Sequence, residues 1–165
     1  MAERTPGDVA REIIDANLYM VLATADEAGR PWASPVYFAN AGYTELLWVS
    51  SPEAIHSRNI ARRPEVGIVI FDSRVPIGTG QGVYMTAIAE AVAPEGIERG
   101  IDVFSRRSRA HGGVAWTPAD VQTEGEWAIR LYRARTTTHS ILAKDGRPDH
   151  GIPAEVWPGA VTGHT

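Results

Sequence analysis

The apolar positions near the start of this chain follow a helical period. Val9, Ile13 and Ile14 are spaced along one face, which predicts a helix that ends at about Asn17. Thr5 is the expected N-cap, because a proline and an acidic residue follow it at capping-box spacing. The sequence therefore predicts an N-terminal helix within residues 1–17.

From Leu18 the period changes to that of β-strands. Six strands are predicted, over residues 19–25, 31–39, 45–50, 66–71, 82–93 and 127–138. The prolines of 31–39 favour an edge position, and the apolar run 66–71 predicts a strand buried on both faces. Short turns join most of these strands, which indicates an antiparallel meander that closes or nearly closes into a barrel.

Helices are predicted between the strands. One opens at Ser51-Pro52-Glu53 and runs to about Arg62, another covers roughly 94–108, and Thr117 caps a short third one. We expect a mainly β fold with inserted helices in a single domain over 1–165. Residues 145–165 are expected to form an irregular tail, in which Trp157 packs against the rest.

Composition narrows the function classes. The net charge of -4 and the pI near 5.7 disfavour a nucleic-acid partner. There is no cysteine and no apolar run long enough to span a membrane, so we expect a cytoplasmic protein without disulfides. Its basic residues are almost all arginine, as expected from a GC-rich bacterial genome. The histidines are scattered, and we predict no metal site and nominate no catalytic side chain.

One strand-to-helix segment carries candidate chemistry. Residues 48–59 place hydroxyl, imidazole, guanidinium and amide groups around the start of the predicted second helix, at Ser50, Ser51, His56, Ser57, Arg58 and Asn59. A helix N-terminus with such groups can bind a phosphate. The same pattern also fits an ordinary capped helix that binds nothing.

Seven short segments in order resemble those of a known family. They are Leu22–Thr24, Gly29–Pro31, Ala33–Val36, Val49–Ser51, His56–Asn59, Pro64–Val66 and Gly80–Val83. The series resembles the pyridoxamine 5′-phosphate oxidase-like family over about residues 15–92. That resemblance implies a six-stranded, Greek-key-like split β-barrel that binds FMN at the interface of a homodimer.

The resemblance also implies roles for particular residues. The strand that begins at Ser34, Pro35 and Val36 would run along the flavin ring. Val49, Ser50 and Ser51 would contact the ribityl chain or phosphate. The helix would hold the phosphate through His56, with Ser57, Arg58 and Asn59 close by. Gln81 would hydrogen-bond the flavin near its ring, beside Gly82.

Two departures argue against vitamin B6 oxidation. True pyridoxamine phosphate oxidases have an arginine and a lysine at the positions of Ser34 and Ala39. They have another basic residue at the position that Ile55 occupies here. The C-terminal motif that holds the vitamin substrate is also unmatched. The phosphate charge would therefore fall mainly on His56 and Arg58.

Several functions remain open at this stage. The leading expectation is an FMN-dependent oxidoreductase acting on a small molecule. The alternatives are a reductase that uses a deazaflavin coenzyme, a flavin-binding stress protein without turnover, and a haem protein with His56 or His111 as the axial ligand. His111 is either a mobile acid or base, or simply exposed. Trp32, Trp116 and Trp127 either stack on the flavin or belong to the core or dimer interface.

Overall fold

The computed structural model describes residues 4–147 and 150–156. The helices are α1 (Pro6–Ala16), α2 (Ile55–Arg62), α3 (Pro94–Ala110) and the short 3-10 helix η1 (Pro118–Val121). The strands are β1 (Tyr19–Ala25), β2 (Pro31–Tyr37), β3 (Ala39–Ala41), β4 (Glu45–Ser50), β5 (Glu65–Phe71), β6 (Gly82–Ala91), β7 (Arg130–Leu142) and β8 (Gly151–Pro153).

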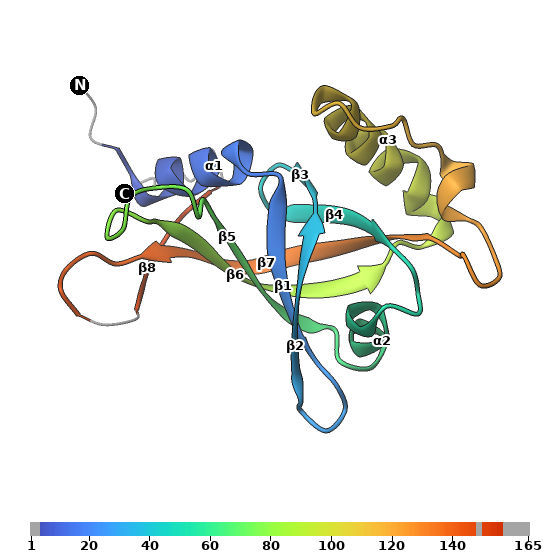
Figure 1. The fold of residues 1–165 in the computed structure, drawn as a ribbon, viewed down its shortest axis with the longest axis horizontal. Coiled ribbons are helices and arrows are strands. Elements are labelled where there is room, and N and C mark those ends of the chain that lie inside the picture. Colours follow the sequence, from blue (N-terminus) through green and yellow to red (C-terminus); the bar gives the residue numbers. More distant parts are fainter. Residues whose placement is uncertain (1–3, 148–149, 157–165) are drawn as a thin grey trace, which may run out of the picture.

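All strands belong to one antiparallel sheet. Its order is β2-β1-β5-β6-β7-β4-β3, with β8 added to β7. The long strands cross one another and curve; α1 and α2 pack against the inner cluster of the sheet and α3 against the outside (Figure 1). β2 stands at an edge, as its prolines predict, and the mainly β split barrel with inserted helices is confirmed.

The first helix begins as its sequence predicts. The Thr5 hydroxyl accepts a hydrogen bond from the Asp8 amide, and the Asp8 carboxylate accepts one from the Thr5 amide, at 3.1 and 2.9 Å. The Thr5 hydroxyl also donates to the Asp8 carboxylate, and this bond together with that from the Thr5 amide lowers the pKa of Asp8 to about 2. Ile14 on the opposite face is fully buried, so α1 closes one side of the barrel core.

Two apolar clusters hold the molecule together. The larger lies inside the curved sheet, where the Trp48 ring stacks on the Tyr132 ring with centroids 5.7 Å apart. The smaller attaches α3 to the outside of β3, β4 and β7, through Phe104, Ile101 and Leu47. The sheet is therefore packed on both sides in this region, which fixes the position of α3.

Four predictions need correction. The sheet has eight strands because β3 and β8, of three residues each, were too short to recognise, and β8 lies in the expected irregular tail. The strand β5 is buried on one face only, since its burial alternates. The second helix begins at Ile55, because Ser51 closes a turn and accepts the Glu53 amide instead. The last long strand begins at Arg130, and Trp127 before it is exposed. The prediction for Trp157 lies outside the described residues.

Among residues 4–147 and 150–156, no helix has the length and apolar character needed to cross a bilayer. The same residues contain no group of three or more metal-ligating side chains.

Candidate functional site

His56 joins two strands that lie far apart in the sheet. Its Nδ1 is 3.2 Å from the Ser34 hydroxyl on β2, and its Nε2 is 2.8 Å from the Ser50 hydroxyl on β4. β2 is one edge of the sheet, and β4 is next to the other edge. The curvature of the sheet thus brings its two ends together, and His56 bridges them at the mouth of the barrel.

The start of α2 leaves backbone donors free at the same place. Ala54 is the N-cap and supplies no side-chain acceptor. Among the described residues, the amides of Ile55, His56 and Ser57 have no backbone acceptor, and the first helical bond runs from Arg58 to Ala54 at 3.0 Å. Such free N–H groups form an anion site at a helix N-terminus.

His56 is neutral in this setting. Burial lowers the pKa of its imidazole below the usual value. Each ring nitrogen faces a serine hydroxyl, which can either donate or accept. The imidazole can therefore take up a proton without losing a hydrogen bond, and a bound anion would favour that protonated form.

Asn59 faces the protein interior. Its side chain is 7% exposed, and its Nδ2 donates to the Thr24 hydroxyl on β1 at 3.0 Å. The Thr24 hydroxyl in turn lies 3.4 Å from the Trp32 carbonyl. This buried series of hydrogen bonds fixes α2 against the β1–β2 hairpin, so Asn59 positions the helix that carries His56.

The remaining predicted residues near the helix differ in orientation. Ser57 is buried, and among the described atoms its hydroxyl has no hydrogen-bond partner. Arg58, two residues after His56 in α2, is exposed and can reach a ligand. Val36 packs toward the inner core beside Met20, while Pro35 lies on the outer face opposite Val21.

Val49 and Ser51 flank the Ser50 position. Val49 precedes Ser50 on β4, so its side chain points to the opposite face of the sheet. There it packs against the apolar cluster under α3. Ser51 is only partly exposed and holds the turn that leads into α2.

Gln81 and Gly82 lie in a different region. The Gln81 side chain is held by backbone, since its Oε1 accepts the Gly82 and Leu142 amides and its Nε2 donates to the Leu142 carbonyl. Both residues line a hollow of about 350 Å³ with Phe71 and Tyr84. This hollow and the His56 cluster share no lining residue.

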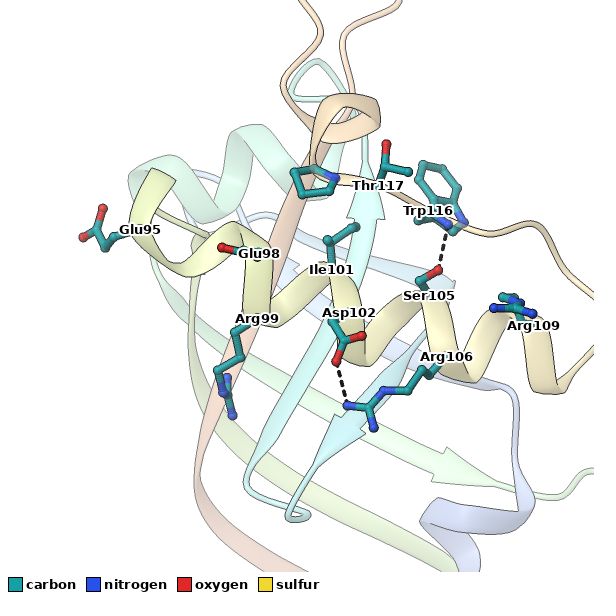
Figure 2. A pocket seen from close by; sticks show the side chains of 11 residues that line it. Glu95, Glu98, Arg99, Ile101, Asp102, Ser105, Arg106, Arg109, Trp116 and Thr117 are labelled. Carbon is teal, nitrogen blue, oxygen red and sulfur yellow. Dashed lines mark hydrogen bonds and ion pairs between the residues drawn. The ribbon is translucent and has the colours of Figure 1, made fainter.

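A larger hollow lies elsewhere, along α3. It has a volume of about 760 Å³ and lies between that helix and the segment that carries Trp116. Figure 2 shows Asp102 paired with Arg106 at 2.8 Å, and Ser105 accepting the Trp116 amide. Acidic and basic side chains alternate here, and none of the lining residues belongs to the predicted flavin site.

Trp32, for which the sequence left a flavin-stacking role open beside a core or interface role, belongs to the His56 cluster. The Trp32 indole donates to the Ser34 hydroxyl at 2.9 Å, and its ring is 46% exposed. Trp32 and Ser34 are two residues apart on one strand and so share a face. That alternation was the available signal, but it could not show that the shared face meets α2.

Comparisons with known proteins agree with this fold. The chain matches the family model described as pyridoxamine 5′-phosphate oxidase over residues 7–138. No curated protein matches its sequence. A heme binding protein from Mycobacterium smegmatis is similar in structure, with a TM-score of 0.70 and 19% identity over 89% of this chain. The present chain spans only 57% of the length of that protein.

Two further solved structures show the range of this fold. HutZ, the heme storage protein from Vibrio cholerae, has a TM-score of 0.63 at 19% identity, covering 85% of this chain and 94% of HutZ. An F420 reductase has a TM-score of 0.58 at 19% identity, covering 79% of this chain and 95% of its own. Such identities show a shared fold alone. Because the family model matches most of the chain and the sheet is a split barrel, the protein belongs to the pyridoxamine 5′-phosphate oxidase family.

Proposed function

We propose that this protein binds FMN at the His56 cluster and uses it to oxidise or reduce a small molecule. The observation that carries the proposal is that the His56 ring, in the first turn of α2 with its free N–H groups, joins the hydroxyls of Ser34 and Ser50 from two strands. Three side chains from three elements meet there, which an ordinary capped helix does not require.

The donor set fits a phosphate group. Two hydroxyls, one imidazole and the backbone amides of α2 supply hydrogen bonds, and exposed Arg58 supplies a permanent charge. Neutral His56 would gain a proton when a dianion binds, which adds a second charge at the site. FMN would supply the two-electron chemistry, while Trp32 and the exposed edge of β2 would orient and shield it.

The outer face of the sheet supports a homodimer with shared sites. Tyr19, Phe71 and Tyr84 on β1, β5 and β6 are 58%, 47% and 38% exposed on this face. Val69 lies between Val21 and Tyr84 on the same face, which adds to its apolar surface. An apolar surface of this kind is typical of a protein interface. A second copy there would bring its Gln81 hollow toward the cofactor of the first.

The first experiment is titration of the apo-protein with FMN, followed by flavin fluorescence. We expect saturation at one FMN per subunit. The double variant His56→Ala/Arg58→Ala should bind FMN at least tenfold more weakly, since one charge-assisted hydrogen bond contributes about 1.5–3 kcal/mol. The matched control is His150→Ala/Arg147→Ala, which removes the same residue types from a surface pair.

F420 and hemin are titrated in parallel, because solved relatives include an F420 reductase and heme binding proteins. Preference for F420 would replace FMN in the proposal. A hemin Soret band that persists in the FMN-saturated protein and is lost in His111→Ala would indicate a haem function instead. Equal FMN affinity in both double variants would show that His56 and Arg58 do not hold the phosphate.

A further inference from the structure

A half-buried cation lies at the far end of the edge strand from the His56 cluster. The Arg107 guanidinium donates from Nη2 to the Asn17 carbonyl at 2.8 Å and lies 5.1 Å from the centre of the Phe38 ring. Its Nε is buried without a hydrogen-bond partner among the described residues. In the same part of the chain Arg107 forms no ion pair, although its neighbour Arg106 pairs with Asp102. Removing a guanidinium from water without a carboxylate partner is costly, so an anionic ligand would stabilise this arrangement.

Two further polar groups face the same place. The Tyr37 hydroxyl is 3.0 Å from Nδ1 of His111, the residue that ends α3. Burial raises the pKa of Tyr37, and the nearby Arg107 charge opposes this shift. The hydroxyl therefore stays protonated and able to donate. Arg107, Tyr37 and His111 together bring a planar charged donor, a hydroxyl and an imidazole to one place.

An aromatic wall stands beside these donors. The Tyr19 ring meets the Tyr37 ring edge-on at 6.0 Å and is 58% exposed, while Leu18 is 41% exposed. Phe104 closes the other side of Tyr37 at 5.6 Å. Polar donors beside exposed apolar surface suit a ligand that has an anionic end and an apolar body.

We infer that Arg107, Tyr37 and His111 form a second anion site, which takes the carboxylate of a small substrate with an aromatic or aliphatic body. Tyr37 and Ser34 are three residues apart on β2, so their side chains lie on opposite faces of this edge strand, about 10 Å apart along it. A substrate whose carboxylate is held at Tyr37 would reach the proposed cofactor by passing round the unpaired edge of β2. The role as substrate site rests on the proposed function, whereas the anion site itself does not.

The test uses benzoate and the purified full-length apo-protein in its own oligomeric state. Binding is followed by NMR of the ¹³C-labelled histidine rings, with His111 assigned through His111→Gln. We expect saturable shifts of the His111 signals with benzoate. Benzyl alcohol, which lacks the charge, should produce none, and inorganic phosphate, which lacks the apolar body, should bind more weakly.

Two variants and one control locate the site. Arg107→Gln keeps a donor for the Asn17 carbonyl but removes the charge, and should weaken benzoate at least tenfold. Tyr37→Phe removes only the hydroxyl and should weaken it severalfold, which tests the site even if Arg107→Gln does not fold. Arg106→Gln, at the adjacent exposed position, should leave the affinity unchanged.

The outcomes separate this inference from the proposed function. No saturable shift in the wild type, or equal benzoate affinity in Arg107→Gln and Arg106→Gln, would overturn the anion site. If phosphate bound as tightly as benzoate, the proposal that the ligand has an apolar body would be overturned. FMN affinity is measured on the same samples and should be unchanged in Arg107→Gln. Benzoate binding to a protein that binds no FMN would retain the anion site and reject its role beside a flavin.

Discussion

At the scale of single residues, polar groups at this site act through their hydrogen-bond partners. His56 contacts serines from two strands, whereas Asn59, three positions later, turns inward to Thr24. One helix therefore presents a ligand group and an anchoring group on different faces. The sequence predicted both residues as cofactor contacts, because adjacent polar residues on a helix look alike until the packed face is known.

Burial of two histidines predicts how stability depends on pH. Desolvation lowers the pKa of His56 and of His139, the latter despite its hydrogen bond to the Tyr43 carbonyl. In the unfolded chain both return to about 6.5. The unfolded state therefore binds protons first, and the free energy of unfolding should fall as the pH drops from 8 to 5.5.

Urea denaturation of the apo-protein at these two pH values checks this. Each unit by which folding lowers the pKa of a histidine contributes about 1.4 kcal/mol to the pH-dependent part of the free energy of unfolding. His56→Gln and His139→Gln should each reduce the pH dependence, and the double variant should reduce it most. A pH dependence as steep in the double variant as in the wild type would contradict the assignment.

At the scale of elements, local signals defined most boundaries. The capping box of α1 and the bounds of β1 and β4 were predicted correctly, since caps, turns and alternation are local. The start of α2 was wrong because Ser51 and Pro52 fit both a helix cap and the turn that they form here. Both faces of β5 carry apolar residues, yet only one face is buried. Which face is covered depends on the elements packed around the strand, and the sequence of β5 does not contain that information.

Helical glycines mark where elements touch. A Cβ on Gly7 of α1 would overlap the Glu155 carbonyl oxygen, whereas on Gly100 of α3 it would meet the flexible end of Leu131 at 2.7 Å. Gly7→Ala should lower the free energy of unfolding by about 1–3 kcal/mol, because backbone cannot move aside as a side chain can. Gly100→Ala should cost less, since alanine favours the helix by about 1 kcal/mol.

Hydrogen exchange gives a local readout for the same pair. The Ala154 amide donates to the His139 carbonyl at 3.0 Å and should lose protection only in Gly7→Ala. Equal loss of stability in the two variants would show that the contact between α1 and residues 154–156 is not close.

At the scale of the whole molecule, one part of the outer face of the sheet is apolar and left uncovered by the described residues, although α3 covers another part. α1 and the barrel core cover the inner face, while the outer surface of β1, β5 and β6 carries Tyr19, Val69 and Tyr84 with no described element packed over them. The predicted homodimer would bury this face and complete each site with residues of the partner.

A charge at the centre of that face tests the dimer. Val69→Asp should yield a monomer in size-exclusion chromatography with light scattering, because an unpaired carboxylate cannot be buried there without a large cost. It should also weaken FMN binding at least tenfold if the site is shared. Val114→Asp places the same charge on a loop at a residue that is 67% exposed, and should remain dimeric. A dimeric Val69→Asp protein would locate the interface elsewhere.

The sequence by itself determined the mainly β class, antiparallel pairs such as β1 with β2 and β5 with β6, and the family, because these depend on local periodicity and on motifs in a fixed order. The predicted meander was wrong, since β1 also pairs with β5 and β4 with β7, and only the tertiary structure could show these distant pairings. Only the tertiary structure decided which polar residues meet. Ser34 and Ser50 lie on strands that the sheet order separates, and curvature closes that distance onto His56. Arg107, Tyr37 and Asn17 come together for the same reason: α3 packs back across the start of the barrel, a contact between distant segments that no local pattern encodes.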